Sequence, residues 1–215
     1  MRLQSTQLAR TTWLMDIGET NPGGRNIFVD LVPALVSEYH FKTSPQEGGD
    51  FKEGMKFTPG TFVNSSGNSV QVAFVIYSDG VAADTYSSTD DSEEFLGLVA
   101  NLLLELGYSY APSMIRKRVY LSQVFVRCDK SLAGLNPRLA AFAKRISETA
   151  GLGLPYTPSG LEFWSDQSKV FKPATFSFQK RAGDDPAEDR YWSQAPLTTQ
   201  DHISLLAELE DILSP

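Results

Sequence analysis

The stretch from residue 68 to residue 106 constrains the fold more than any other part of the chain. "NSVQVAFVIY" (68–77) carries apolar residues on both faces, which is typical of a central strand of a sheet. Ser78-Asp79-Gly80 predicts a tight turn, and residues 81–87 return as the antiparallel partner strand. A helix follows directly, because its apolar residues recur every three or four positions: Phe95, Leu98, Val99, Leu102, Leu103 and Leu106. We expect Val99, Leu102, Leu103 and Leu106 to be buried.

The remaining pattern extends this hairpin into an α+β fold. Further strands are expected at residues 11–17, 116–129, 161–166 and 174–181, with a tight turn at 58–60 between two short strands. Helices are expected from about 33 to 39, at 136–151 and at 198–213. Tight turns between consecutive strands imply antiparallel pairing. The sequence therefore predicts a mostly antiparallel sheet built from hairpins, with about four helices packed on it.

The helix at 136–151 has the clearest amphipathic pattern in the chain. Pro137 fits its first turn, Asn136 can cap it, and Gly151 stops it. Its predicted inner face consists of Leu139, Phe142, Ala143 and Ile146.

Length and repeats bear on the domain organisation. We find no internal repeat in the sequence, and 215 residues suffice for one substantial core. A single α+β domain spanning 1–215 is therefore expected. The segment "LGLPYTPSG" reads as a linker, so a small C-terminal subdomain from about residue 155 is the alternative.

Composition indicates a cytoplasmic protein. The only cysteine, Cys128, cannot form an internal disulfide. No run approaches the roughly 18 apolar residues of a membrane span, and the N-terminus has no apolar core of signal-peptide length. The net charge of −7 disfavours general nucleic-acid binding.

Charge is distributed in three blocks. Residues 1–110 hold 14 acids and 6 bases, residues 111–181 hold 4 acids and 12 bases, and residues 182–215 hold 8 acids and 1 base. The net charges are thus −8, +8 and −7. Complementary blocks of this kind favour contact between protein surfaces, either within one chain or between chains.

The acidic stretch 79–94 contains six carboxylates. Four of them, at positions 90, 91, 93 and 94, are explained by helix capping and the helix dipole, with Thr89, Asp90 or Asp91 as the cap. Asp79 is explained by the turn, which leaves Asp84 in a strand. The alternative is a divalent-metal site of Asp84, Asp90 and Asp91 in a metal-dependent hydrolase.

The basic block 111–181 supplies candidate partner-binding residues. Arg116 and Arg118 share one face of a strand, and Lys180 and Arg181 end another. If those two strands are neighbours, they form a basic edge. That edge would bind a protein partner or, alternatively, nucleic acid or a phosphorylated ligand; the plain structural interpretation is a charged edge strand that resists aggregation.

Catalytic motifs are absent from the sequence. No nucleophile elbow, phosphate loop or dinucleotide fingerprint is present, and no cofactor is expected. His40 and His202 have no neighbours at metal-ligand spacing, so both are expected at the surface or at helix caps. The leading hypothesis is a non-enzymatic assembly protein, a subunit of a homo-oligomer or of a larger bacterial or phage complex.

Overall fold

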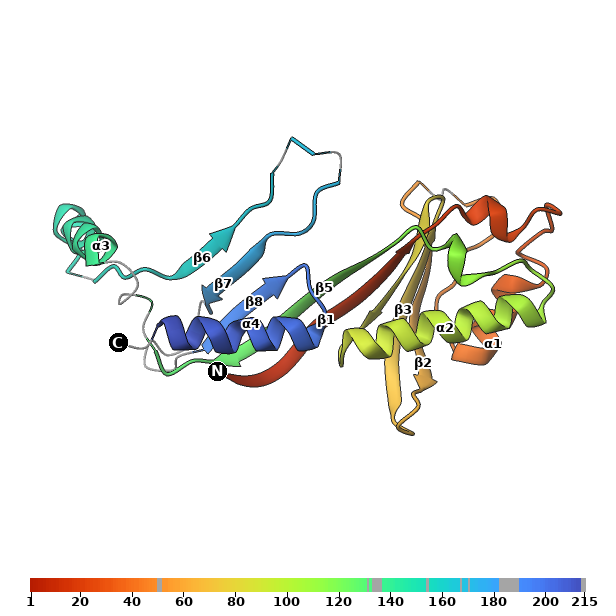
Figure 1. Ribbon diagram of the computed structural model, residues 1–215, viewed down its shortest axis with the longest axis horizontal. Helices are drawn as coiled ribbons and strands as arrows, with labels where there is room; N and C mark the ends of the chain where they lie inside the picture. Colours follow the sequence, from red (N-terminus) through yellow and green to blue (C-terminus); the bar gives the residue numbers. More distant parts are fainter. Residues whose placement is uncertain are drawn as a thin grey trace. The chain divides into compact units, whose positions relative to one another are not determined.

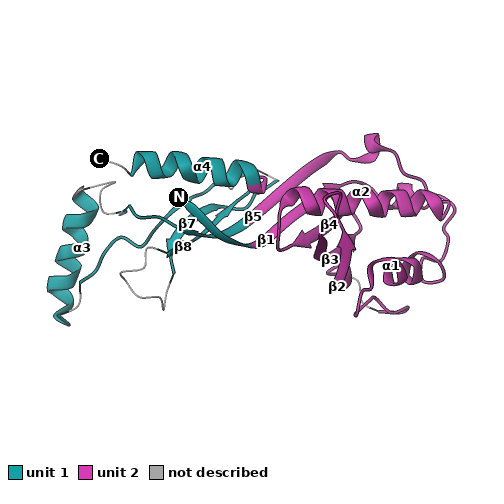
Figure 2. Ribbon diagram, turned by 90° about the horizontal axis from the view of Figure 1, so that it is seen from below, with its two compact units in different colours: residues 1–6, 123–196, 200–215 teal, residues 7–122, 197–199 magenta. Residues whose placement is uncertain are grey.

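The computed structural model describes residues 1–49, 52–130, 132, 137–153, 155–166, 168–169, 171–181 and 190–213. The chain forms two compact units (Figure 2). Unit 1 comprises residues 1–6, 123–196 and 200–215, and unit 2 comprises residues 7–122 and 197–199. The prediction of one domain remains a prediction, because a compact unit need not fold alone.

The fold class is α+β, as the sequence predicted (Figure 1). The strands are β1 (Arg2–Leu14), β2 (Met55–Val63), β3 (Ser69–Tyr77), β4 (Gly80–Thr85), β5 (Lys117–Arg127), β6 (Gly160–Phe163), β7 (Phe176–Lys180) and β8 (Arg190–Ala195). The α-helices are α1 (Leu31–Tyr39), α2 (Thr89–Glu105), α3 (Pro137–Ala150) and α4 (Thr199–Ile212), and the 3-10 helices are η1 (Ile17–Thr20) and η2 (Pro112–Met114). Within the described residues, no helix is long and apolar enough to span a bilayer.

The element order contains an internal repeat that the sequence did not reveal. The order β-α-β-β-β-α occurs twice, first as β1 to α2 and then as β5 to α4. The strand order in the sheet is β2-β3-β4-β1-β5-β8-β7-β6. It is symmetric about its centre, so that β1 corresponds to β5, β4 to β8, β3 to β7 and β2 to β6. The prediction that the chain has no internal repeat is therefore wrong at the level of structure.

The second halves of the two repeats are separated by 110 residues in the sequence. Strands β4 and β8 have bounds 110 residues apart, and so do the first residues of α2 and α4. Few residue types persist at that offset: Thr89, Asp91, Leu96 and Leu103 correspond to Thr199, Asp201, Leu206 and Leu213. The repeat was missed because burial and spacing persist while most side chains differ.

Equivalent threonines are joined in unit 2. The backbone N–H of Thr89 donates to Oγ1 of Thr199 (3.0 Å), and the backbone N–H of Thr199 donates to Oγ1 of Thr89 (2.9 Å). Each hydroxyl thus satisfies a first-turn amide that has no partner inside its own helix. Both threonines are buried, so each would leave an unsatisfied amide if replaced by alanine.

Unit 2 has an aromatic core between its strands and the helices α1 and α2. Phe95 of α2 lies at its centre, with the ring centroids of Tyr39, Phe62 and Phe74 at 4.8, 5.3 and 5.6 Å. Of the four α2 residues predicted to be buried, Val99 is buried, whereas Leu102, Leu103 and Leu106 are half-buried against this core.

Unit 1 has a smaller core, beneath α4. It joins Val124, Val126, Cys128, Leu132, Phe178, Tyr191, Leu206 and Leu213. Strand β8, which contributes Tyr191, was not predicted. The burial of His202 follows from this packing and contradicts the expectation of a surface or cap position. His40 is an exposed C-cap of α1 with φ 54°, as expected.

Two local predictions are also corrected. Residues 58–60 do not form a turn: β2 is one strand whose register shifts between Phe57 and Gly60. A Cβ at Gly60 would lie 2.5 Å from the ring of Phe41, so glycine lets that ring close over the strand. The N-cap of α2 is Ser88, whose hydroxyl accepts from the Asp91 amide (3.1 Å), rather than Thr89, Asp90 or Asp91.

Candidate functional site

The apolar face of α3 is exposed, contrary to the prediction that it packs inward. Leu139, Phe142 and Ile146 are 50%, 62% and 36% exposed, and only Ala143 of the predicted inner face is buried. The unit 1 core contains no α3 residue among those described. The helix stands apart from the strands, whereas α4 lies against them (Figures 1 and 2). Asn136, the predicted cap, lies outside the described residues.

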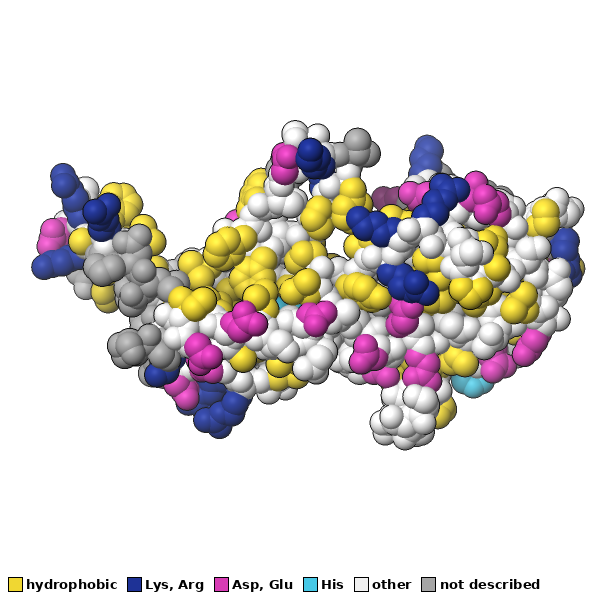
Figure 3. Space-filling model, in the orientation of Figure 1, with side chains coloured by type: hydrophobic (Ala, Val, Ile, Leu, Met, Phe, Trp, Pro, Cys, Tyr) yellow, Lys and Arg dark blue, Asp and Glu magenta, His cyan; other side chains and the backbone are white. Residues whose placement is uncertain are grey.

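The strand pair β6–β7 carries a second exposed apolar surface in unit 1. Leu161 pairs with Phe178 and Phe163 with Phe176, so all four lie on one face of the sheet. Helix α4 covers the part of this face around the buried Phe178. Phe163, on the same face, is 62% exposed. Figure 3 shows hydrophobic side chains gathered over this part of the unit (Figure 3). Trp164 and Phe171 nearby in the chain are 66% and 40% exposed.

Unit 2 shows what the equivalent surface looks like when a helix covers it. There Phe57 and Phe74, paired across β2 and β3, are both fully buried. The covering helices are α1, which buries Leu31, Leu35 and Tyr39, and α2, whose Phe95 lies 5.6 Å from Phe74 between ring centroids. Helix α3 has the same place as α1 in the element order. Among the described residues of unit 1, the apolar face of α3 is thus largely exposed, and α4 leaves the part of the β6–β7 surface around Phe163 uncovered.

The charges on the two helices of unit 1 are opposite in sign. Helix α3 carries three bases and one acid: Arg138, Lys144, Arg145 and Glu148. Helix α4 carries four acids and no lysine or arginine: Asp201, Glu208, Glu210 and Asp211. Acidic side chains follow the edge of α4 beside the hydrophobic surface (Figure 3). The exposed apolar surfaces are therefore flanked by complementary charge.

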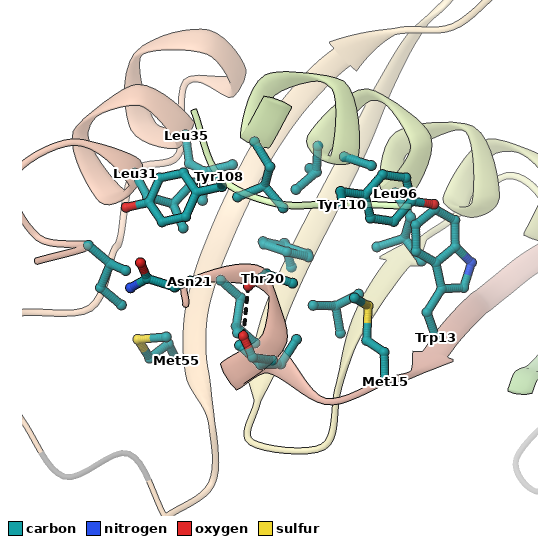
Figure 4. A pocket seen from close by; sticks show the side chains of 18 of the residues that line it. Trp13, Met15, Thr20, Asn21, Leu31, Leu35, Met55, Leu96, Tyr108 and Tyr110 are labelled. Carbon is teal, nitrogen blue, oxygen red and sulfur yellow. Dashed lines mark hydrogen bonds between the residues drawn. The ribbon is translucent and has the colours of Figure 1, made fainter. Parts of the chain in front are cut away.

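A second candidate site is an apolar cavity of about 280 Å³ inside unit 2 (Figure 4). Its floor is formed by strand residues, including Trp13, Phe74 and Ile76, and its roof by α1 and α2, including Leu35 and Ala100. The 3-10 helix η1 and the segment of Tyr108 and Tyr110 complete the wall. Packed protein interiors rarely contain voids much larger than a water molecule, so a cavity of this size is unusual for a core.

Polar groups around the cavity are mostly bound to other protein atoms. Thr20 donates to the Ile17 carbonyl (2.7 Å), and the Trp13 indole N–H donates to Glu93 (3.0 Å). The Tyr108 hydroxyl donates to Asp30. Burial and that hydrogen bond raise the pKa of Tyr108 to about 12. The same hydrogen bond lowers the pKa of Asp30.

The acidic residues proposed for a metal site have other roles in the structure. Asp84 accepts two hydrogen bonds from Arg10, at 2.6 and 2.7 Å, across strands β1 and β4. Asp91 accepts from Asn64 (2.7 Å), and Asp90 is an exposed residue in the first turn of α2. Among the described residues, no three His, Cys, Asp or Glu side chains are grouped closely enough to hold a metal ion. The hydrolase alternative has no geometric support here.

The basic residues do not form the edge that was considered. The strand that follows Arg116 and holds Arg118 is β5, and β8 separates it from β7, which ends at Lys180. Arg118 binds Glu93 (2.8 Å), and its guanidinium lies 5.6 Å from the Trp13 ring. Arg116 lies 3.9 Å from Glu19. Arg181 lies over the Phe125 ring at 4.1 Å. These contacts favour an intramolecular role for the basic residues.

Reversing the charge of Arg118 tests that role. Arg118→Glu would place a carboxylate beside Glu93 and remove the guanidinium from Trp13, so we expect about 1 kcal/mol less stability. Denaturant unfolding measures this loss, with Lys117→Glu on the same strand as the control. An unchanged midpoint combined with reduced oligomer mass would instead support partner binding by Arg118.

Comparisons with known proteins add little. No family model matches the chain, and no curated protein matches it. Among solved structures it is similar to the TBP of Methanococcus jannaschii, with 12% identity over 99% of this chain and 96% of that one and a TM-score of 0.39. That likeness is too weak to support an argument about function.

Proposed function

We propose that the protein is a non-enzymatic assembly protein that associates with copies of itself through unit 1. The observation that carries the proposal is the pair of exposed, complementary apolar surfaces in that unit. One is the α3 face of Leu139, Phe142 and Ile146, and the other is the β6–β7 surface around Phe163. Exposed apolar surface flanked by polar residues is typical of a protein–protein interface.

The arrangement of unit 2 supports a second copy of the chain as the occupant. Helix α1 covers β2 and β3 in unit 2, so an amphipathic helix is the partner that this strand arrangement accepts. In unit 1 the corresponding helix is α3, whose apolar residues Leu139, Phe142 and Ile146 remain exposed within the described part of the chain. Seating α3 of one copy on β6–β7 of another would bury both surfaces. The exchange is reciprocal, so it closes into a dimer.

Charge supports the same pairing. The net positive flank of α3 would lie against the acidic α4, which borders the β6–β7 surface. Opposite charge at the rim speeds encounter and sets orientation, while the apolar residues provide most of the affinity. The charge segregation in the sequence is thereby assigned to α3 and α4 rather than to Arg116 and Arg118.

Phe142→Asp tests the proposal. A carboxylate at the centre of the α3 face would have to be desolvated in the interface, so we expect at least a hundredfold weaker self-association. Sedimentation velocity over a range of concentrations measures the mass. Tyr86→Asp is the matched control, because Tyr86 is an aromatic residue of unit 2 with nearly the same exposure, 61% against 62%.

Two outcomes contradict self-association. The first is a wild-type protein that stays monomeric at every concentration. The second is an equal mass for wild type and Phe142→Asp. If Phe142→Asp lowers the melting temperature of a monomeric protein, α3 packs on its own chain instead.

A further inference from the structure

We propose that the cavity of unit 2 is a binding site for a neutral, mainly apolar small molecule of about ten to twelve carbon atoms with one polar group. The inference is independent of self-association, since all residues lining the cavity belong to unit 2.

The size of the ligand follows from the volume. An apolar cavity of roughly 150 Å³ accepts a benzene ring. The cavity here is nearly twice as large, at about 280 Å³. A fused two-ring aromatic or a folded chain of similar carbon number would therefore fill it.

The side chains that line the cavity favour a ligand that is mainly apolar. Leucine, isoleucine, valine, methionine and aromatic side chains supply most of its surface. The exceptions near the mouth are already engaged: the Asn21 side chain donates to the Arg25 carbonyl (2.9 Å) and accepts from its amide (3.0 Å). A ligand with several polar groups would lose its hydration without replacement and would bind poorly.

One hydroxyl remains to recognise a polar group. Tyr110 stacks on Trp13 with ring centroids 6.0 Å apart, and burial raises the pKa of its hydroxyl. Within the described part of the chain, that hydroxyl has no hydrogen-bond partner. Tyr110 is half-buried, as are Ile17, Ile27 and Met55 of the same lining.

Charge at the mouth excludes an ionic ligand. Arg25 is bound to Asp30 (2.6 Å) and Arg118 to Glu93 (2.8 Å). Both of these arginines are thus matched by a carboxylate. An anionic head group would have to displace an existing ion pair, so a neutral hydroxyl or carbonyl is favoured.

1-Naphthol is a suitable probe, because it combines two fused rings with one neutral hydroxyl. Isothermal titration calorimetry should give saturable binding with one site per chain. The Trp13 indole N–H resonance should shift during the titration, since Trp13 lines the cavity. The anion 1-naphthoate should bind at least tenfold more weakly.

Variants locate the site. Ala100→Leu adds side-chain volume from α2 and should weaken 1-naphthol binding at least tenfold without lowering the melting temperature. Ala207→Leu is the control, because Ala207 is exposed on α4 and does not line the cavity. Tyr110→Phe should weaken binding about fivefold, the effect of one hydrogen bond. If Ala100→Leu disturbs folding, Val81→Phe fills the cavity from the strand side.

The proposal is overturned by either of two results. One is the absence of saturable binding up to the solubility limit of 1-naphthol. The other is equal affinity in wild type and in a folded cavity-filling variant, which would place the probe elsewhere.

Discussion

Replacing Phe95 by alanine is expected to lower the free energy of unfolding by about 3–5 kcal/mol. Phe95 is fully buried and lies among four aromatic rings, those of Tyr39, Phe41, Phe62 and Phe74. Deleting its ring removes apolar burial and leaves a cavity that the packed elements α1, β2 and β3 cannot readily close. Rings at these distances also interact edge-to-face, which adds to the loss.

Leu104→Ala is the matched control for this experiment. Leu104 lies on the same helix and is 49% exposed, so its truncation should change stability by less than about 0.5 kcal/mol. Chemical denaturation followed by circular dichroism measures both variants. A Phe95→Ala protein as stable as Leu104→Ala would mean that Phe95 does not organise the core of unit 2.

The second large effect is a loss of stability on acidification that depends on His202. This side chain is fully buried and hydrogen-bonded to Ser193 (2.9 Å), and burial lowers its pKa to about 4. The Ser193 hydroxyl donates its proton to the Ser177 carbonyl (2.8 Å), so the Nε2 atom of His202 is the donor to Ser193. The imidazole is therefore neutral in the folded protein near pH 7.

The direction of this pH dependence of stability follows from proton linkage. Between the unfolded pKa of about 6.5 and the folded pKa of about 4, the unfolded chain binds a proton that the folded chain does not. Stability therefore rises with pH through this window and is lost as the pH falls, by on the order of 3 kcal/mol in total. Unfolding measured from pH 7 to pH 4 tests this.

His202→Gln should flatten the dependence in that window, because glutamine does not titrate. His40→Gln should leave it unchanged, since His40 is exposed. A slope that persists in His202→Gln would assign the effect to other groups.

Much of the local structure was predictable from local patterns. Helix α2 follows from the spacing of Phe95 and Val99, and the β3–β4 hairpin from the Asp79-Gly80 turn. Hydrogen bonds and side-chain contacts within one element depend on residues that are close in sequence. The positions of helices and strands could therefore be derived without knowing which other elements they pack against.

The candidate sites were much less predictable. The sequence identified the apolar face of α3 but could not show that most of this face is exposed in the structure as described. The cavity draws its wall from residues as far apart as Trp13 and Tyr110, so no single window contains its signal. The charge segregation suggested Arg116 and Arg118 as partner-binding residues, and the structure shows them beside Glu19 and Glu93 of the same chain.

By itself, the sequence determined the α+β class, most helices and strands, and the amphipathic faces that require burial. Only the tertiary structure decided which faces are buried, that the β-α-β-β-β-α order is repeated, and that Asp84 accepts hydrogen bonds from Arg10. The physical reason is that helix and turn formation depend on neighbours in the chain. Burial, ion pairing and the pKa of His202 depend instead on residues that only folding brings together.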